Sequence, residues 1–179
     1  MKDNENFLMQ PFIENSIPLF VIPTTSGTGS EATKFAVIYY KGKKQSVTHE
    51  SIIPNGVLLE PNVLENVPKY QRKATMFDAL CHAIESYWSV NSTDQSRLYS
   101  KRALEIIFDN MESYLNNEYL GNKNMLIAAN TAGKAINISQ TTAAHAMCYK
   151  VTSMYGIAHG HAAAIMLPKI WRYMLYSMN

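Results

Sequence analysis

The first sixty residues place short apolar runs between polar turns, a pattern that predicts β-strands. Residues 17–22 form an apolar run that stops at Pro23 and predicts a short buried strand. Residues 35–40 predict a second strand, and residues 45–48 predict its returning partner after a lysine-rich turn. Residues 57–59 predict one more short buried strand. Strands this short and few cannot close a stable sheet by themselves, so we expect the edge of a larger α/β unit.

After Pro61 the apolar residues recur every three or four positions, which is the period of an amphipathic helix. The pattern predicts a helix over residues 68–88, and residues 92–94 (Ser-Thr-Asp) are capping residue types in front of a second helix. Three more helices are predicted over residues 125–138, 142–154 and 160–176, the last with a kink or break at Pro168. The second part of the chain is therefore predicted to be all-helical.

The composition is that of a globular protein, with 47% hydrophobic residues, and it excludes general disorder. The 16 basic and 14 acidic side chains give a net charge of +2 without a lysine and arginine block, which argues against a nucleic-acid partner. The apolar stretches are far shorter than the roughly 20 residues that span a membrane, and the polar N-terminus is not typical of a signal peptide. Two cysteines, Cys81 and Cys148, are too few for a disulfide scaffold, so we expect a cytoplasmic protein.

The first candidate for chemistry is a pair of residues on the helix predicted over 68–88. Asp78 and His82 are four positions apart, so they project from the same helical face and can grip one metal ion. A pair with this spacing is common by chance, and a surface carboxylate beside a polar helix position is the alternative. The neighbouring residues are apolar, however, which predicts that the helix is buried on several sides. A buried carboxylate requires a partner that offsets its desolvation.

Two later histidines extend this candidate set. His145 lies in an apolar helix interior, and His159 lies at the predicted start of the last helix. Each by itself is more simply a hydrogen-bonded core histidine. Together with Asp78 and His82 they supply one carboxylate and three imidazoles, a ligand set that suits iron or zinc with one coordination position open for a Lewis-acid catalyst. His161 would point elsewhere on a helix and is left out.

A third feature is the loop over residues 23–33, which follows the first predicted strand and is rich in glycine, threonine and serine. Gly27, Gly29 and Ala32 satisfy the G-x-G-x-x-A pattern of dinucleotide binding, but the residues after them predict a strand where that motif requires a helix. The backbone N–H groups and hydroxyls of the loop can meet phosphate or ribose oxygens. A glycine-rich turn with hydroxyl caps and no ligand is the alternative.

Taken in order, these segments resemble the iron-containing alcohol dehydrogenase family. The resemblance rests on Ile-Pro-Thr-Thr-Ser-Gly-Thr-Gly-Ser-Glu at 22–31, on Asp-Ala-Leu-Cys-His-Ala-Ile-Glu at 78–85, and on two histidines fourteen residues apart at 145 and 159. It implies a metal held by Asp78, His82, His145 and His159. It also implies that NAD(H) or NADP(H) is contacted by Thr24, Thr25, Thr28, Thr33, Phe35 and Lys44. Many relatives have a further histidine, thought to help proton transfer, where this chain has Tyr149, which is either its substitute or a packing residue.

The resemblance also implies a fold and a division into domains. The fold is an α/β edge followed by a mainly α-helical domain, in the dehydroquinate synthase-like architecture of iron-containing alcohol dehydrogenases, truncated at both ends. Residues 1–60 would be the C-terminal part of the nucleotide-binding domain, and residues 61–179 an incomplete helical metal-binding domain. The loop that cradles the pyrophosphate would lie upstream of Met1, and the full-length protein would be able to form a homo-oligomer.

The implied activity is hydride transfer between NAD(P) and a small alcohol or aldehyde, with Fe²⁺ or Zn²⁺ polarising the substrate oxygen. The run from His145 to His161 is similar to the phosphonoacetaldehyde reductase branch, in which Lys150 or Arg72 would neutralise a phosphonate. Each of these two cations is otherwise expected to be solvated at the surface. The alternatives are an inactive truncated fragment, a metal-dependent non-redox enzyme of the dehydroquinate synthase type, and a plain nucleotide-binding module.

Overall fold

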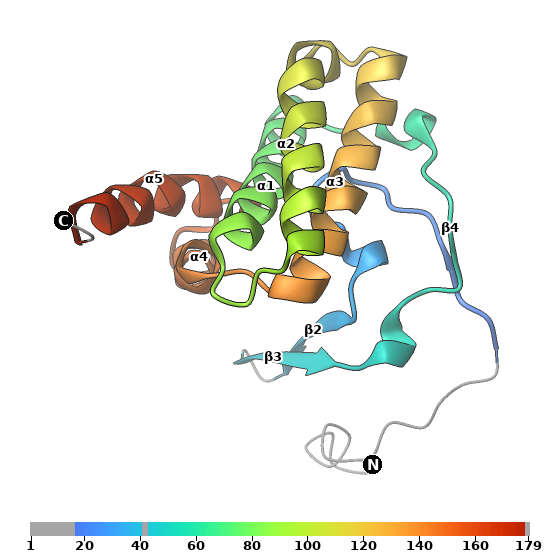
Figure 1. Ribbon diagram of the computed structural model, residues 1–179. Coiled ribbons are helices and arrows are strands. Elements are labelled where there is room, and N and C mark those ends of the chain that lie inside the picture. Colours follow the sequence, from blue (N-terminus) through green and yellow to red (C-terminus); the bar gives the residue numbers. More distant parts are fainter. Residues whose placement is uncertain (1–16, 41–42, 178–179) are drawn as a thin grey trace.

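A computed structural model describes residues 17–40 and 43–177, with only the backbone of residues 39, 40, 43 and 44 (Figure 1). The described strands form two small, separate pairs. β1 (Phe20–Val21) runs parallel to β4 (Gly56–Val57), and β2 (Phe35–Tyr40) pairs antiparallel with β3 (Lys43–Thr48). The hairpin confirms the predicted pairing of the second strand with its return strand. Its register, from Phe35 opposite Thr48 to Tyr40 opposite Lys43, extends the return strand two residues beyond the prediction.

The prediction that the first and last apolar runs are buried is wrong for the described part of the chain. Phe20 of β1 is 72% exposed, and Leu58, just after β4, is 54% exposed. An apolar strand is buried only when other elements cover its faces, and a two-stranded ribbon has no such cover. Among the described residues β1 has only β4 beside it, so both regular strands are two residues long.

All five predicted helices are present (Figure 1). They are α1 (Lys69–Trp88), α2 (Asp94–Leu115), α3 (Tyr119–Ser139), α4 (Ala143–Tyr155) and α5 (His159–Ser177). The predicted N-terminus of α2 is confirmed, because the Thr93 hydroxyl accepts from the Ser96 N–H in a reciprocal capping box. α5 continues through Pro168 as one helix, so the break considered there is absent. None of the helices in residues 17–40 and 43–177 is long and apolar enough to cross a membrane.

α3 begins six residues before its predicted start, because tertiary packing extends it. Its first turn carries Tyr119 and Leu120, which are both exposed and so give no amphipathic period. Gly121 lies so close to α2 that an added Cβ would be 2.3 Å from the Tyr114 nitrogen. This close approach continues the helix across residues that the hydrophobic pattern does not mark.

The helices bury two main apolar clusters. The first joins α1, α2, α3 and the short helix η4 (Pro61–Leu64), and its members include Leu64, Met76, Ile107, Tyr114, Met125 and Leu126. The second joins α1, α4 and α5, and its buried members are Cys81, Ala144, Cys148, Ala162, Ala163 and Leu167. Small side chains dominate the second cluster, so α5 can pack closely on α1 before it extends away from the helical bundle (Figure 1).

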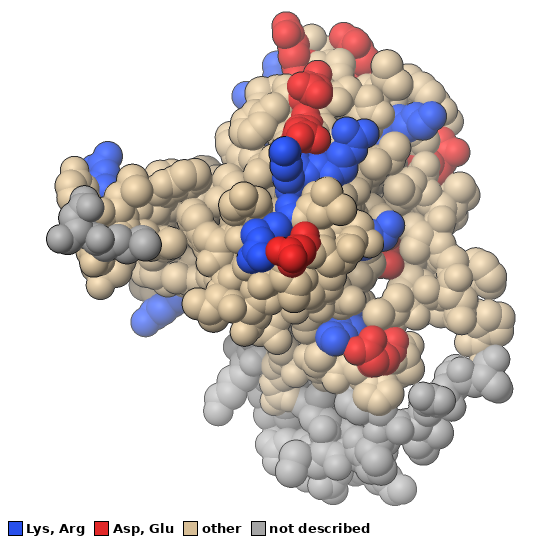
Figure 2. Space-filling model, in the orientation of Figure 1, with Lys and Arg blue, Asp and Glu red and all other residues tan. Residues whose placement is uncertain are grey.

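Basic and acidic side chains lie close to one another on the face shown in Figure 2.

Arg72 is a structural residue of the core, so both sequence-based interpretations of it, as a phosphonate ligand or as a surface cation, are wrong. It is 2% exposed, and its guanidinium lies 4.6 Å from the centre of the Tyr114 ring. It donates to the backbone oxygens of Leu64 and Tyr114 and to the side-chain oxygens of Asn117 and Asn122. Both terminal nitrogens of its guanidinium are therefore engaged inside the helical unit.

One stripe of α3 receives the glycine-rich loop. Asn130, Gly133 and Asn137 recur at helical spacing, and each meets the segment that contains the loop. The Asn130 amide donates to Glu31 at 3.0 Å, and the Asn137 side-chain oxygen accepts from the Lys34 N–H at 2.9 Å. Between them, a Cβ added to Gly133 would be 2.4 Å from the Gly29 oxygen. The segment is therefore held by a backbone contact that only glycine permits, with one hydrogen bond on each side of it.

We expect Gly133→Ala to destabilise the protein. The added methyl group must push the backbone at Gly29 away from α3, and such overpacking costs roughly 1–3 kcal/mol, against the about 1 kcal/mol that alanine gains over glycine in a helix. Urea denaturation should therefore show a lower free energy of unfolding. The control is Lys134→Ala on the exposed side of α3, which should change the stability little. A Gly133→Ala protein as stable as the unmodified one would contradict this packing.

Candidate metal centre

Three helices bring the predicted metal ligands together. Asp78 and His82 lie on α1, His145 on α4, and His159 is the first residue of α5. The Asp78 Oδ1 atom is 3.5 Å from His145 Nε2 and 3.9 Å from His159 Nε2. One potential ligand atom from each of these three residues lies within 4.8 Å of the others. Residues far apart in the sequence therefore converge on one point.

His82 takes part in the cluster through its ring face. Its imidazole stacks on that of His145, with 4.3 Å between ring centres and 14° between ring planes. The grouping of ligand atoms within 4.8 Å contains Asp78, His145 and His159 but not His82. The ligand role of His82 therefore stays a prediction.

Unpartnered polar atoms show that this cluster fits a cation. Asp78 is 3% exposed, so the alternative of a surface carboxylate is wrong. Asp78 Oδ1, His82 Nδ1 and His145 Nε2 are buried, and no described residue hydrogen-bonds them. A buried polar atom without a partner costs roughly 1–3 kcal/mol, and a divalent ion would satisfy a carboxylate oxygen and imidazole nitrogens together. The simple alternative of a fully hydrogen-bonded core histidine does not fit His82 or His145.

The electrostatics of the cluster favour a negative carboxylate. Burial alone would raise the pKa of Asp78, but the neighbouring imidazoles of His82, His145 and His159 hold it below its usual value. Burial lowers the pKa of His82 to about 4, so this ring is neutral. Burial also acts to lower the pKa of His145, but Asp78 and Glu85 raise it to about 9. Any cation that binds here must therefore compete with a proton on His145.

Glu85 is a residue of the site that the sequence analysis did not single out. It lies seven positions after Asp78 and three after His82, on the same face of α1, and it is 0% exposed. Its carboxylate accepts from the first turn of α4 and from the ring of His145. Burial would raise its pKa, but its bonds to His145 and Thr142 hold it lower. The sequence signal was this same helical spacing of a third polar residue.

Tyr149 and His161 have different surroundings. Tyr149 stacks on His159, with 5.0 Å between ring centres, and it lines the cavity beside the cluster. The stacking fits a packing residue, and the position on the cavity leaves its role in proton transfer a prediction. His161 Nδ1 lies 3.0 Å from the Tyr70 hydroxyl, which also accepts from the Ala158 N–H. His161 therefore points away from the cluster, as predicted.

A cavity of about 830 Å³ connects the cluster with the glycine-rich loop and the β2–β3 hairpin. All four predicted metal ligands line it, together with Thr28, Thr33, Phe35, Gln140, Tyr149 and Thr152. The described residues of its lining include no lysine or arginine, and Lys150, like Arg72, is not among them. Besides the cluster itself, these described residues offer hydroxyl and amide groups to a ligand.

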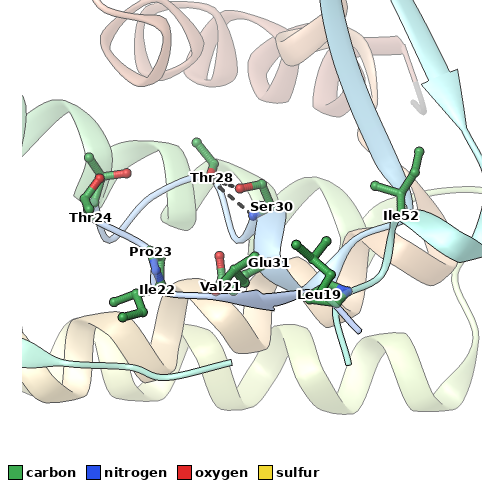
Figure 3. Close-up of a pocket in the computed structure, with 11 residues that line it drawn as sticks. Leu19, Val21, Ile22, Pro23, Thr24, Thr28, Ser30, Glu31 and Ile52 are labelled. Atoms are coloured by element: carbon green, nitrogen blue, oxygen red, sulfur yellow. Dashed lines mark hydrogen bonds between the residues drawn. The ribbon is translucent and has the colours of Figure 1, made fainter. Parts of the chain in front are cut away.

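A second pocket of about 280 Å³ lies along the glycine-rich loop (Figure 3). Thr24, Thr28 and Ser30 lie on one side of it and the apolar residues Leu19 and Ile22 on the other. The predicted nucleotide contacts thus divide between two cavities: Thr24 and Thr25 line this one, Thr33 and Phe35 line the larger one, and Thr28 lines both. The side chain of Lys44 lies outside the described residues. The one-turn helix η2 (Ser30–Ala32) lies within the loop, and the strand β2 follows it where the dinucleotide motif requires an α-helix, as predicted.

The carboxylate–imidazole cluster and the part of the threonine-rich loop that borders the same cavity form the candidate site. The model of the Fe-containing alcohol dehydrogenase family, C-terminal, matches residues 73–179, and the model named Iron-containing alcohol dehydrogenase matches residues 2–61. The chain belongs to the iron-containing alcohol dehydrogenase family.

Individual relatives show the same kinship. The chain is 33% identical over 165 residues to Aldehyde-alcohol dehydrogenase 2 of Entamoeba histolytica. The matched region covers 91% of this chain and 19% of that enzyme. The chain is 30% identical over 162 residues to the phosphonoacetaldehyde reductase of Streptomyces viridochromogenes, covering 88% of this chain and 41% of that enzyme. The chain thus spans less than half the length of these relatives.

Solved structures confirm the fold. Sulfoacetaldehyde reductase from Bifidobacterium kashiwanohense, in complex with NAD⁺, superposes with a TM-score of 0.87 at 27% identity, over 92% of this chain and 45% of that one. An iron-containing alcohol dehydrogenase from Thermotoga maritima superposes with a TM-score of 0.82 at 33% identity, over 89% of this chain and 44% of that one. The predicted architecture is therefore confirmed.

We expect Gly160→Ala to disrupt the cluster. A Cβ at Gly160 would lie 2.0 Å from the Ala74 oxygen and 2.7 Å from the Asp78 Cβ, so α5 must move away from α1 and carry His159 with it. Titration with Co²⁺ should show weaker binding, and denaturation a loss of about 1–3 kcal/mol. Gly156→Ala is the matched control, because it strains a positive φ of 67° but meets no atom within 4 Å. If both variants lose stability but bind Co²⁺ equally well, the α1–α5 contact does not set the cluster geometry.

Proposed function

We propose that this chain supplies the metal site and part of the cofactor cleft of an NAD(P)-dependent alcohol dehydrogenase. The reaction is reversible hydride transfer between the nicotinamide and a small alcohol or aldehyde. The observation that carries the proposal is the convergence of buried, unpartnered atoms of Asp78, His82 and His145, with His159, on one cavity. Membership of the family supports it.

The proposed ligands are Asp78, His82, His145 and His159. Bound there, Fe²⁺ or Zn²⁺ would act as a Lewis acid on the substrate oxygen. Asp78 would attract the cation by its negative charge inside the helical unit, and the imidazoles around it would offer nitrogen atoms as metal ligands. The donor set suits either metal.

The proposed cofactor cleft runs from the glycine-rich loop to the β2–β3 hairpin. Thr24, Thr25 and Thr28 place hydroxyls along the smaller pocket, where they would bond phosphate or ribose oxygens. Thr33 and Phe35 line the cavity that also holds the cluster, and this is where the nicotinamide would lie. Lys44 is proposed as a further contact. Both NAD(H) and NADP(H) are proposed as cofactors, and the complex of the sulfoacetaldehyde reductase with NAD⁺ supports NAD(H).

The first proposed substrate class is a small neutral alcohol or aldehyde. A phosphonate or sulfonate group requires a cation for tight binding, and the described lining of the cavity provides no lysine or arginine. Phosphonoacetaldehyde is the second candidate, because of the similarity to a phosphonoacetaldehyde reductase. Tyr149 is proposed to exchange the substrate proton in place of a histidine, because it lines the cavity beside His159.

The organisation of the protein is part of the proposal. Residues 1–60 are proposed to be the end of the nucleotide-binding domain and residues 61–179 an incomplete metal-binding domain, and separate family models matching residues 2–61 and 73–179 support a division of the chain into two parts. A cytoplasmic location is also proposed, because Cys81 and Cys148 are free, buried cysteines and form no disulfide. Assembly of the complete protein into a homo-oligomer is also proposed.

His159→Ala tests the metal site. In the protein expressed from its complete gene, we expect it to lower bound iron or zinc and NAD⁺-dependent oxidation of primary alcohols by at least about 100-fold, more than changes outside the ligand shell cause. The measurements are metal analysis of the purified protein and NADH absorbance. His161→Ala is the matched control, because that ring bonds Tyr70 and is not in the cluster. It should keep both metal and activity.

The same assay separates the rival functions. A His159→Ala protein that retains its metal and its rate would sink the proposed site. An unmodified protein that binds metal and NAD⁺ but oxidises no alcohol and reduces no aldehyde would favour a non-redox enzyme of the dehydroquinate synthase type. One that binds neither would favour an inactive fragment. Greater activity on phosphonoacetaldehyde than on neutral aldehydes would reverse the order of the two substrate classes.

A further inference from the structure

Glu85 is the most deeply buried acid in the described part of the chain, at 0% exposure. A carboxylate in a protein interior is costly unless both of its oxygens are satisfied. Neither family resemblance nor hydrophobic period gives it a task, and it lines neither cavity described above. Its contacts account for the burial.

One oxygen of Glu85 binds the beginning of α4. Oε1 accepts from the backbone N–H groups of Thr142 at 3.0 Å, Ala144 at 3.0 Å and His145 at 3.4 Å, and from the Thr142 hydroxyl at 2.5 Å. The first N–H groups of a helix have no partner within it, and they favour a negative charge. Thr142 itself makes no side-chain cap. Glu85 on α1 therefore provides the cap for α4 from outside.

The other oxygen of Glu85 orients the ring of His145. Oε2 pairs with His145 Nδ1. An ionised carboxylate only accepts hydrogen bonds, so Nδ1 is the ring nitrogen that donates. The second nitrogen, Nε2, then faces Asp78 Oδ1 at 3.5 Å, where both atoms lack a hydrogen-bond partner. One carboxylate thus fixes both the backbone that carries His145 and the rotation of its ring.

We propose that Glu85 is a positioning residue that fixes His145 with its proton on Nδ1 and its Nε2 directed at the metal site. The inference rests on the proposed function, because it assigns Nε2 as the metal-binding nitrogen. Ligating histidines are commonly held by a carboxylate on their other nitrogen, and the loss of such a partner weakens metal binding by about 10–100-fold.

Glu85→Gln tests the inference with little change of shape. The amide oxygen can still accept from the first turn of α4, but an NH₂ group then meets the donating Nδ1 of His145. The His145 ring must then turn or move its proton to Nε2. Either change takes the Nε2 lone pair away from the metal site. In the protein from its complete gene, Co²⁺ should bind about 10–100-fold more weakly than in the unmodified protein. The visible absorption of the Co²⁺ protein should change as well.

Thr142→Val is the matched control. It removes one donor to Glu85 Oε1, together with the bond that the Thr142 hydroxyl accepts from Trp88, but leaves the Oε2–His145 pair. It should lower the melting temperature while Co²⁺ affinity stays within about threefold and the absorption spectrum is unchanged. Equal loss of affinity in both variants would overturn the positioning role, since a weaker cap alone would then explain it. So would a Glu85→Gln protein with unchanged affinity and spectrum.

A measurement on the unmodified protein covers the case in which Glu85→Gln does not fold. In the zinc-loaded protein labelled with ¹⁵N-histidine, NMR should show the His145 proton on Nδ1 and zinc on Nε2. Zinc on Nδ1 would overturn the inference and leave the proposed function intact. Failure of the unmodified protein to bind Co²⁺ or Zn²⁺ would instead contradict the proposed function itself.

Discussion

Two carboxylates buried inside the helical unit, Asp78 and Glu85 on α1, impose the condition that the surrounding helices satisfy. Leaving a buried charge unpaired costs several kcal/mol, which is a large share of the stability of a domain. The first turn of α4 surrounds Glu85 with donors, and His145 on the same helix bonds it through its ring. The imidazoles of α1, α4 and α5 surround Asp78. The placement of α4 and α5 against α1 therefore depends on electrostatic interactions with Asp78 and Glu85 as much as on hydrophobic packing.

The glycine-rich loop is tied to the same unit by polar contacts of a different kind. Glycine at positions 29 and 133 lets the loop backbone touch α3. A hydrogen bond that Asn130 donates and one that Asn137 accepts hold the segment on either side of this contact. Inside the bundle the Ser26 hydroxyl donates to that of Tyr114 at 2.7 Å, and the Tyr114 ring lies against Arg72. The threonines proposed to meet a nucleotide are thus fixed relative to the helices that carry the proposed metal ligands. Hydride transfer depends on this kind of fixed geometry, because the reacting atoms must be held in close alignment.

Family membership and geometry answer different questions about this chain. Membership identifies the family and, with the solved structures, the fold, while the similar enzymes carry different substrate names. The geometry shows what the described residues supply: one carboxylate–imidazole cluster, hydroxyl groups along two cavities, and no lysine or arginine in the lining of the larger cavity. Selection among aldehydes is therefore proposed to depend on the hydrogen-bonding groups and the shape of the part of the cavity that these residues line.

The sequence by itself determined the five helices and the hairpin, because helical period, the cap at Thr93 and strand alternation are local properties of the chain. It also marked Asp78 and His82 as one helical face, whereas His145 and His159 joined them as metal ligands only as what the family resemblance implies. Tertiary structure decided what local pattern does not carry. The early start of α3, the exposure of Phe20 and the burial of Arg72 each depend on which neighbours an element meets. The same holds for the stacking of His82 on His145 and for the bond from His145 to Glu85, which joins residues sixty positions apart. Contacts of this kind are set only when α4 packs against α1, because spacing along one helix says nothing of what lies opposite it.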